Sequence, residues 1–549
     1  MTSSESSDTI TRASTLGQLL AARVATSPVA EALRFGDRSM TYRELELEAR
    51  RMAGTLRRWG VEPGDRIALL LDNGLDAPVA WFAAAALEAV VVPIDTRLGA
   101  RDLAWVLNHS GASVVVVGAG RRAKVHSVRT SVPGVRSVLE RSDEAPGPWT
   151  RAALNDGFGP EIDSTASIGP EDADPQAPVA IQYTSGTTGF PKGCVLHHGY
   201  WLRLARTIQS FSGVTSRDVL ITAQPQSYMD PTWNLVLGVL AGAPLVILPR
   251  FSASTFWADV SRAGATFFYC IGTMPLYLLK QPENPELDRG HDVRLVYCSG
   301  IPAVHHEEME RRWGCLWRET YGSTELGVVL AAHPEDEHTV GSGSMGRPVS
   351  GRDVAVEVQS DTPSGELLVR GPDTMLRYHE DESATESWTQ QGWARTGDIV
   401  RKVDEGYALV GRTKDMIRRG GENISAAEVE SVLNEHVGVR AAACIPVPDE
   451  LRGEEVKAYV LPVAGVALSE AEIHAFVAAR LARFKVPRYV ELVTDFPITQ
   501  SGKIAKGDLR ASRADHVTGA WDASQRSVGD APGLGRVADQ GSNRDGTRI

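Results

Sequence analysis

Between residues 41 and 118 the sequence alternates between helical and extended patterns, and this alternation constrains the fold more than any other feature. Residues 41–59 begin with Thr41, carry Glu44 three positions later and continue with apolar residues at helical spacing, which predicts a helix with a capping box. Strands are then predicted at 66–71, 90–93 and 112–118, with helices between them at 77–89 and 101–109. This order predicts a parallel, doubly wound sheet.

The alternation returns after residue 178 and changes character after residue 340. Residues 340–410 contain short strands among Gly, Pro and Asp, which predict a small β unit, and an α+β block follows. The predicted fold class is therefore α/β: a large N-terminal domain of two doubly wound α/β lobes plus a small β unit, with a small α+β C-terminal domain. The predicted boundaries are a disordered N-terminus at 1–16, the N-terminal domain at 17–411, a connection at 412–414, the C-terminal domain at 415–512 and a disordered tail at 513–549.

Composition excludes several classes of protein. The net charge of −12 argues against general nucleic-acid binding, which needs concentrated Lys and Arg. The five cysteines are scattered and form no CxxC pair, which indicates reduced thiols in a cytoplasmic protein. Residues 1–16 contain no apolar core of a secretory signal, and the longest apolar run, 77–94, is broken by Pro78, Glu88 and Pro93. We therefore expect no membrane span.

Residues 183–193, YTSGTTGFPKG, contain a candidate phosphate loop. Two glycines allow the backbone to approach a ligand closely, hydroxyl side chains and backbone N–H groups offer donors, and a lysine adds a positive charge. Two residues separate the second glycine from the lysine, so the loop is not of the Walker type. The predicted polyphosphate-binding residues are Thr184, Ser185, Gly186, Thr187, Thr188, Gly189 and Lys192.

This loop resembles that of the adenylate-forming superfamily, which comprises acyl-CoA synthetases, peptide-synthetase adenylation domains and beetle luciferases. The resemblance extends from about residue 17 to about residue 510 and recurs in order at further motifs. It implies an adenylating N-terminal domain, a mobile C-terminal domain, and ATP and Mg²⁺ as ligands. The run PRFSASTFWADV at 249–260 looks most like the crotonobetaine/carnitine–CoA ligase branch.

The further motifs imply a nucleotide site. YGSTELG at 321–327 resembles the adenylate-binding segment, and CSGIP at 298–302 resembles the loop that lies along the adenine. WARTGD at 393–398 resembles the motif whose aspartate binds the ribose hydroxyls. Among these motifs, Glu325 would hold Mg²⁺, and Thr324 would donate to the α-phosphate. The other implied nucleotide-binding residues are Ser299, Gly300, Ile301, Pro302, Tyr321, Gly322, Asp398 and Arg412.

The resemblance also assigns roles near the C-terminus. In PITQSGKIAK, Lys503 resembles the catalytic lysine, whose ammonium would stabilise charge on the phosphoryl oxygens alongside Glu325 and Thr184. The connection at 412–414 resembles the family's hinge, with Lys414 at the pivot. Gly420 and Gly421 resemble the glycines that line the tunnel for the thiol.

The acid pocket departs from the family pattern. The family often has a Pro-x-x-His element, whereas here Tyr228 stands at the histidine position. Asp230 and Trp233 follow, and with Met274 complete the predicted substrate pocket. These side chains would favour a cationic or amine-bearing acid through ion pairing and cation–π contact. A small aromatic acid is equally compatible, and so is a purely structural role at the start of a helix.

The predicted function is ATP-dependent activation of a small carboxylic acid to its acyl-adenylate, followed by transfer of the acyl group to coenzyme A. The alternative is a stand-alone adenylating enzyme that passes the activated group to a carrier protein or an amine, including nitrite activation for arylamine diazotisation. A nucleotide-binding regulator is disfavoured because both Lys503 and Glu325 are present. The sequence does not predict an oligomeric state.

Overall fold

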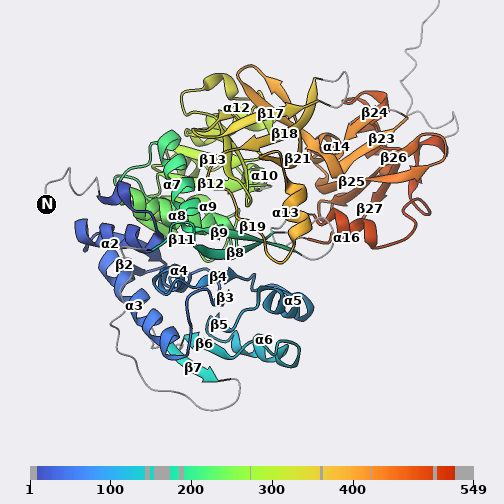
Figure 1. Cartoon of the computed structure of the whole chain (residues 1–549). Helices are drawn as coiled ribbons and strands as arrows, with labels where there is room; N and C mark the ends of the chain where they lie inside the picture. The colour runs from blue at the N-terminus through green and yellow to red at the C-terminus, as the bar shows by residue number, and fades with distance from the viewer. Residues whose placement is uncertain are drawn as a thin grey trace, which may run out of the picture. The chain divides into compact units, whose positions relative to one another are not determined.

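The computed structural model of this chain describes residues 9–141, 149–153, 173–184, 191–272, 274–358, 363–420, 422–498 and 504–525. The chain divides into two compact units, one drawn from residues 1–414 and 497–509 and the other from residues 415–496 and 510–549 (Figure 1). The division falls between Lys414 and Asp415, where the sequence predicts a connection. We call these the N-terminal and C-terminal units.

The first lobe of the N-terminal unit is a mostly parallel sheet with helices on both faces. Successive residues of its central strand alternate between two cores: Ile67 and Leu69 pack with α4 (Asp76–Ala86), whereas Ala68 and Leu70 pack with α5 (Ala100–Ser110). This confirms the doubly wound prediction. The strand order is β19 (Arg377–Tyr378), β9 (Lys192–His197), β8 (Pro178–Thr184), β4 (Val90–Pro93), β3 (Arg66–Leu70), β5 (Val114–Val117), β6 (Ser137–Arg141) and β7 (Trp149–Ala153).

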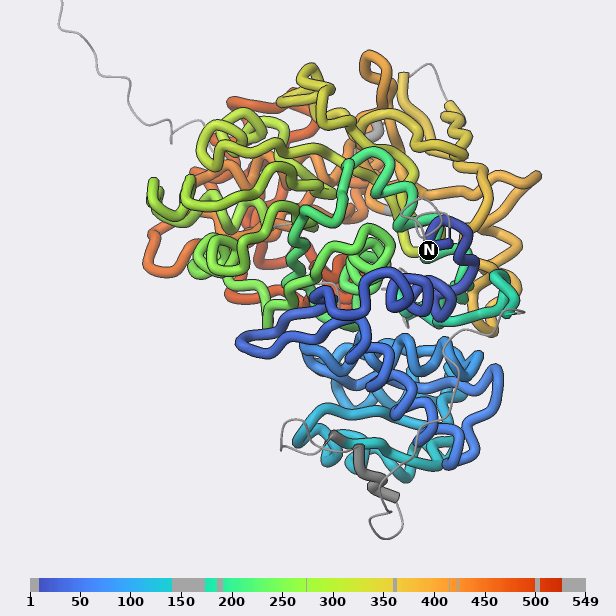
Figure 2. Tube along the Cα trace, turned by 90° about the vertical axis from the view of Figure 1, so that its left-hand side faces the viewer, coloured from blue at the N-terminus to red at the C-terminus, as the bar shows by residue number. Residues whose placement is uncertain are grey.

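The second lobe is also built on a largely parallel sheet, and it incorporates strands from the start of the chain. β1 pairs in parallel with β11, so the dark-blue N-terminal segment lies beside the green part of the chain (Figure 1 and Figure 2). The strand order is β16 (Arg347–Pro348), β15 (Gly327–Ala331), β14 (Leu316–Ser323), β13 (Leu295–Ser299), β12 (Phe267–Ile271), β10 (Leu220–Thr222), β11 (Leu245–Ile247), β1 (Glu31–Phe35) and β2 (Arg38–Thr41).

A small antiparallel sheet completes the N-terminal unit, as the sequence predicts. Its strands are β17 (Asp353–Glu357), β18 (Ser364–Arg370), β21 (Trp393–Val403) and β20 (Thr389–Gln390), with β22 (Gly406–Arg412) paired to β21. The remaining helices of this unit are α2 (Leu16–Thr26), α3 (Tyr42–Arg58), α6 (Arg122–His126), α7 (His198–Ser212), α8 (Met229–Ala241), α9 (Phe256–Ala263), α10 (Met274–Leu279), α11 (Pro285–Arg289), α12 (His306–Trp313) and α13 (Glu382–Trp388).

Helix α3 begins where the sequence predicts. Thr41 is its N-cap, its hydroxyl accepts a hydrogen bond from the Glu44 backbone N–H, and the Glu44 carboxylate accepts one from the Thr41 N–H. The capping box is therefore confirmed, and its two bonds satisfy backbone donors that have no partner inside the helix. None of the helices in the described part of the chain is both long enough and apolar enough to cross a bilayer.

The C-terminal unit is an α+β structure. Its strands are β24 (Glu422–Ser425), β23 (Met416–Arg419), β26 (Gly453–Pro462), β27 (Tyr489–Leu492) and β28 (Trp521–Asp522), with β25 (Val439–Asp449) paired to β26. Helices α14 (Ala426–Asn434) and α15 (Glu470–Ala478) contribute Val429, Leu433, Ile473 and Val477 to one core with the strands. Helix α16 (Lys506–Ala511) spans the third point of division between the units, between Leu509 and Arg510.

Both predicted disordered ends are wrong in part. At the N-terminus, Ile10 and Ala13 are buried, and Thr15 caps α2 by accepting a hydrogen bond from Gln18 N–H, so residues 9–16 belong to the fold. At the other end, β28 pairs with β27. Residues 513–525 are poor in large apolar side chains, and they dock through ion pairs and one tryptophan instead. Residues 1–8 and 526–549 lie outside the described residues.

Candidate active site

The ends of the predicted phosphate loop meet in the structure. Thr184 is the last residue of β8 and Lys192 the first of β9, and the two face each other across the antiparallel pair. The Thr184 hydroxyl lies 3.5 Å from the Lys192 carbonyl oxygen. The chain therefore leaves and re-enters the sheet at one point, which suits a loop that folds around a ligand. Ser185, Gly186, Thr187, Thr188 and Gly189 lie outside the described residues.

The turn that carries Thr324 and Glu325 is held at three successive carbonyl groups. The Tyr200 hydroxyl donates to the Thr324 carbonyl at 2.9 Å, the Met375 N–H donates to the Glu325 carbonyl at 2.8 Å, and Arg352 Nη2 donates to the Leu326 carbonyl at 2.5 Å. The three donors come from α7, the segment before β19 and the segment before β17. This arrangement fixes the backbone from which the side chains of Thr324 and Glu325 project.

The Glu325 side chain is held by a tyrosine that the sequence did not single out. Tyr378 Oη donates to Glu325 Oε1 at 2.8 Å. Burial, followed by the charge of Glu325, raises the pKa of Tyr378, so the hydroxyl stays protonated and remains a donor. Lys192 Nζ lies 4.9 Å from the centre of the same ring and 3.7 Å from Asp381. Tyr378 therefore connects the phosphate-loop lysine to the predicted magnesium ligand.

The residues around Glu325 fit Mg²⁺ rather than a metal held wholly by protein. Within the described ranges no group of three or more His, Cys, Asp or Glu side chains gathers as a metal cage. A Mg²⁺ ion in a phosphate-transfer site usually takes one or two carboxylates, several waters and the phosphates of the substrate. Glu325 uses one oxygen to accept from Tyr378, and a carboxylate has further lone pairs for a cation.

Asp398, the predicted ribose ligand, lies in a compact network with two other predicted nucleotide-binding residues, Arg412 and Tyr321. Asp398 on β21 and Arg412 on β22 are directly paired in register, and Arg412 Nε lies 2.7 Å from Asp398 Oδ1. Tyr321 Oη donates to Asp398 Oδ2 at 2.7 Å. Burial and the Asp398 charge raise the pKa of Tyr321, which keeps it a donor. Three residues from three strands thus meet at one carboxylate, which is 4% exposed.

The predicted adenine loop is anchored by Glu319. Ser299 ends β13, and Gly300 follows with a φ of +107°, a conformation that favours glycine. The N–H groups of Gly300 and Ile301 donate to the two oxygens of Glu319 at 2.6 and 2.7 Å. Burial raises the pKa of Glu319 to about 8, although the two amide donors favour the charged form. Pro302 follows the anchored pair.

A cavity that is open to solvent lies beside the Thr324–Glu325 turn, and together with its open side it encloses about 480 Å³. Asp230 and Trp233, on successive turns of α8, both line it, and the Trp233 indole N–H donates to Asp230 Oδ1 at 3.1 Å. Met229 lines the cavity as well, and its sulfur lies 3.7 Å from the Thr324 hydroxyl. Most of the remaining wall is aromatic or apolar, from Phe211, Phe267, Tyr269, Tyr297, Leu204, Ile208 and Val328.

Tyr228 and Met274 take other positions. Tyr228 is the N-cap of α8, and its hydroxyl accepts a hydrogen bond from Arg97 Nη2 at 3.2 Å. Burial raises the pKa of Tyr228 to about 12. Met274 begins α10 and packs in the core of the second lobe with Ile301 and Trp317. Neither belongs to the set of residues that lines the cavity.

Gly322 is required for close packing, since a Cβ there would lie 2.3 Å from the Gly327 carbonyl oxygen.

Of the four residues predicted near the C-terminus, the structure describes two, Lys414 and Gly420. Gly420 follows β23 with a φ of +59°, which glycine adopts readily. Lys414 lies in a short 3₁₀ turn at the division between the units. Gly421 and Lys503 lie outside the described residues.

Sequence reasoning missed four side chains that support the site: Tyr200, Glu319, Arg352 and Tyr378. None of the four carried a local signal in the sequence, because each acts on a segment distant in the sequence. Tyr200, for example, contacts a carbonyl 124 positions away.

The comparisons with known proteins agree with this geometry. The model of the AMP-binding enzyme family matches residues 20–379, and that of the AMP-binding enzyme C-terminal domain matches residues 428–503. Crotonobetaine/carnitine–CoA ligase of Salmonella paratyphi A is 30% identical over 86% of this chain and 93% of its own length. The structure of Bacillus subtilis o-succinylbenzoate CoA synthetase in complex with its acyl-adenylate has a TM-score of 0.77, with 28% identity over 90% of this chain and 98% of that one. The same enzyme with ATP and a magnesium ion gives a TM-score of 0.76 and 29% identity over 89% and 98%.

Proposed function

The chain belongs to the AMP-binding enzyme family and is an AMP-forming ligase, and from this premise we propose that it activates a small, amine-bearing aromatic acid with ATP and transfers the acyl group to coenzyme A. The family assignment confirms the resemblance found in the sequence. The identity of the acid and of the acceptor is the proposal.

We infer the class of acid from the carboxylate of Asp230, which lies in the wall of a largely aromatic cavity. Asp230 is 8% exposed. A buried carboxylate is stabilised by hydrogen-bond donors or cations, and the Trp233 indole N–H supplies one such donor. The aromatic faces of Trp233 and Tyr269, which pack edge to face at 5.2 Å, suit both an aromatic ring and an ammonium group.

The residues around the cavity suit adenylation of such an acid. The substrate carboxylate would attack the α-phosphorus of ATP and expel pyrophosphate, and a thiolate would then attack the acyl carbon and expel AMP. The Thr324 hydroxyl lies 3.7 Å from the sulfur of Met229 in the cavity wall, so the acid and the α-phosphate would meet at the turn that Tyr200 and Arg352 hold. Mg²⁺ held by Glu325 would offset the phosphate charge, and Lys503 would neutralise the charge that develops on the reacting oxygens.

We also propose a hinge between the two units and a path for the thiol. We place the hinge at Lys414, which is supported by the division of the chain between Lys414 and Asp415. Rotation of the C-terminal unit about this point would exchange the residues that face the adenylate between the two half-reactions. The glycine at 420 would border the path of the pantetheine thiol.

The test is a panel of carboxylic acids assayed for release of pyrophosphate and AMP, with and without coenzyme A. The panel pairs aminobenzoates with benzoate and includes carnitine-like acids. We expect an amine-bearing aromatic acid to be preferred over its partner without the amine by at least ~10-fold in kcat/KM. Asp230→Asn should abolish this preference, whereas Trp233→Phe, which keeps a ring but removes the N–H, should reduce it. A preference that Asp230→Asn leaves intact would contradict the assignment.

The same panel separates the alternative acceptors. AMP release that depends on coenzyme A, with a product of acyl-CoA mass, supports the ligase. AMP release that needs only an amine or a carrier protein, or that occurs with nitrite and an arylamine, supports the alternative adenylating enzyme.

A further inference from the structure

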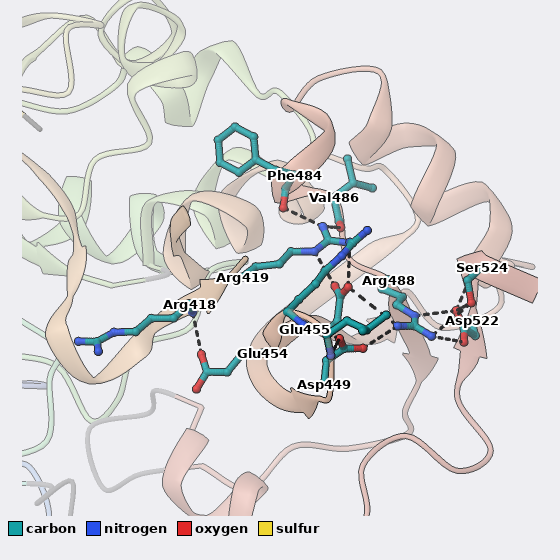
Figure 3. Close-up of polar contacts among 12 residues, drawn as sticks. Arg418, Arg419, Asp449, Glu454, Glu455, Phe484, Val486, Arg488, Asp522 and Ser524 are labelled. Carbon is teal, nitrogen blue, oxygen red and sulfur yellow. Dashed lines mark hydrogen bonds and ion pairs between the residues drawn. The ribbon is translucent and has the colours of Figure 1, made fainter. Parts of the chain in front are cut away.

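The β23–β24 hairpin of the C-terminal unit is tied to β26 at its backbone. The Arg418 N–H donates to Glu454 Oε2 at 2.7 Å, and the Gly420 N–H donates to the Arg452 carbonyl at 2.8 Å. Arg419 pairs in register with Gly453. The hairpin is therefore anchored beside β26, where Arg418 lies next to Glu454 (Figure 3), and Gly420 follows β23.

A fully buried carboxylate fixes the side chain of Arg419. Glu455 is 0% exposed, and its oxygens lie 2.6 Å from Arg419 Nε and 2.9 Å from Arg452 Nη1. Arg419 Nη1 also donates to the carbonyls of Phe484 and Val486 at 2.8 and 3.1 Å. A buried charge of this kind is tolerated only when its partners are in place, so loss of one partner is transmitted to the others.

Arg488 joins this buried cluster to the C-terminal end of the described chain. Its Nη1 lies 2.8 Å from Asp449 and 4.0 Å from Glu455. On its other side, Nε and Nη2 reach the two oxygens of Asp522 at 3.2 and 3.3 Å, and Nη2 also donates to the Ser524 hydroxyl (Figure 3). Asp522 thus holds Arg488 in a bidentate geometry, which fixes the guanidinium plane.

Charge balance shows why the last segment matters to the hairpin. The cluster contains three arginines, at 419, 452 and 488, and three carboxylates, at 449, 455 and 522. Without Asp522, Arg488 would lose its bidentate partner and compete with Arg419 for Glu455. The segment that supplies Asp522 is docked independently, because His516 Nδ1 lies 2.6 Å from the Tyr459 hydroxyl and Arg513 pairs with Glu491 at 2.6 Å.

We propose that residues 513–525 form a C-terminal clasp that positions the β23–β24 hairpin through Asp522, Arg488 and Glu455. The hairpin carries the glycine that would border the thiol path, so the catalytic consequence rests on the proposed function. The clasp is then required for acyl transfer to the thiol and not for adenylation, whose candidate residues Tyr321, Glu325 and Asp398 belong to the N-terminal unit.

Two truncations and two substitutions test the clasp. One protein ends at Gln525 and retains it, and the other ends at Ser512 and lacks it. In the full chain, Asp522→Asn removes the carboxylate that holds Arg488, whereas Asp515→Asn alters a carboxylate of the same segment that accepts from Val517 and Thr518 in its own turn. The Asp522→Asn variant covers the case in which the shorter truncation fails to fold.

We expect Asp522→Asn and the chain ending at Ser512 to slow acyl transfer from supplied acyl-adenylate to coenzyme A by ~10-fold, with pyrophosphate exchange changed less than ~2-fold. Amide hydrogen exchange across residues 416–425 should accelerate in both, and Asp515→Asn and the chain ending at Gln525 should match the wild type.

Unchanged hairpin exchange in Asp522→Asn overturns the proposal, and so does a loosened hairpin with normal acyl transfer. Equal loss of both half-reactions, with faster exchange throughout the C-terminal unit, would indicate a general stabilising role and overturn it as well. If the wild type transfers nothing to coenzyme A, the proposed acceptor is wrong, and the exchange measurement alone then decides whether the clasp positions the hairpin.

Discussion

Tyr378 donates a 2.8 Å hydrogen bond to the carboxylate of Glu325, from a strand 53 residues further along the chain. The same ring lies under the Lys192 ammonium at 4.9 Å. One aromatic side chain therefore orients the candidate magnesium ligand and also borders the cation of the phosphate loop, so the geometry of both depends on β19.

Tyr378→Phe should weaken the magnesium site while leaving the ring in place. Loss of the hydroxyl frees the Glu325 carboxylate to rotate, and removal of such a supporting partner typically costs a metal site at least ~10-fold in affinity. We expect the Mg²⁺ concentration for half-maximal pyrophosphate exchange to rise by about that factor, with the KM for the acid unchanged. Tyr277→Phe, at a tyrosine that is 39% exposed, is the control. An unaltered Mg²⁺ requirement would show that the hydrogen bond is not functional.

Arg352→Lys should lower the rate of adenylation by more than the accompanying loss of stability can explain. Arg352 bridges the carbonyls of Leu326 and Pro372 on two separate loops, and a lysine cannot reproduce that fork. Arg23→Lys is a matched control, because both arginines are 8% exposed and Arg23 also donates to two carbonyls, those of Val239 and Leu240. We expect both variants to lower Tm and only Arg352→Lys to lower kcat for adenylation, by ~10-fold. Equal activity losses at equal Tm would argue for a purely structural role.

Glu319 should make stability depend on pH. Its pKa is raised to about 8 in the folded chain from 4.5, so the folded state holds the proton more tightly than the unfolded state. This contribution to stability is fully present below the unfolded pKa and is lost as pH rises towards 8. The Tm of the wild type minus that of Glu319→Gln should therefore fall between pH 5 and pH 8, by roughly 5 °C. A difference that does not change with pH would mean that Glu319 is ionised throughout.

Lys503→Ala should abolish adenylate formation and spare acyl transfer from supplied acyl-adenylate, since the ammonium is needed only where charge develops on the reacting oxygens. Lys506→Ala, three positions along in the same segment, should leave pyrophosphate exchange near the wild-type rate. The comparison is made by measuring both half-reactions separately. Near-normal exchange in Lys503→Ala would remove the lysine from the mechanism.

Much of the candidate nucleotide site can be predicted from the sequence, because the residues of each motif are close together along the chain. Asp398 and Arg412 are fourteen positions apart, and a strand, a turn and a second strand between them are enough to place the two face to face. The capping box of α3 depends on only four residues. The predicted pocket residues do not all line one cavity: Asp230 and Trp233 line it because both project from one face of α8, whereas Tyr228, at the helix start, contacts Arg97.

By itself, the sequence determined the alternation of strands and helices, the two α/β lobes and the order of the binding motifs, because periodicity and short-range chemistry act between neighbours along the chain. Only the tertiary structure decided which distant groups meet those motifs: Glu319 at the predicted adenine loop, Tyr378 at Glu325, Arg352 between two loops and Asp522 at Arg488. A polar side chain that becomes buried takes whichever partner the folded backbone brings within reach, and that partner is set by the packing of whole sheets rather than by sequence spacing.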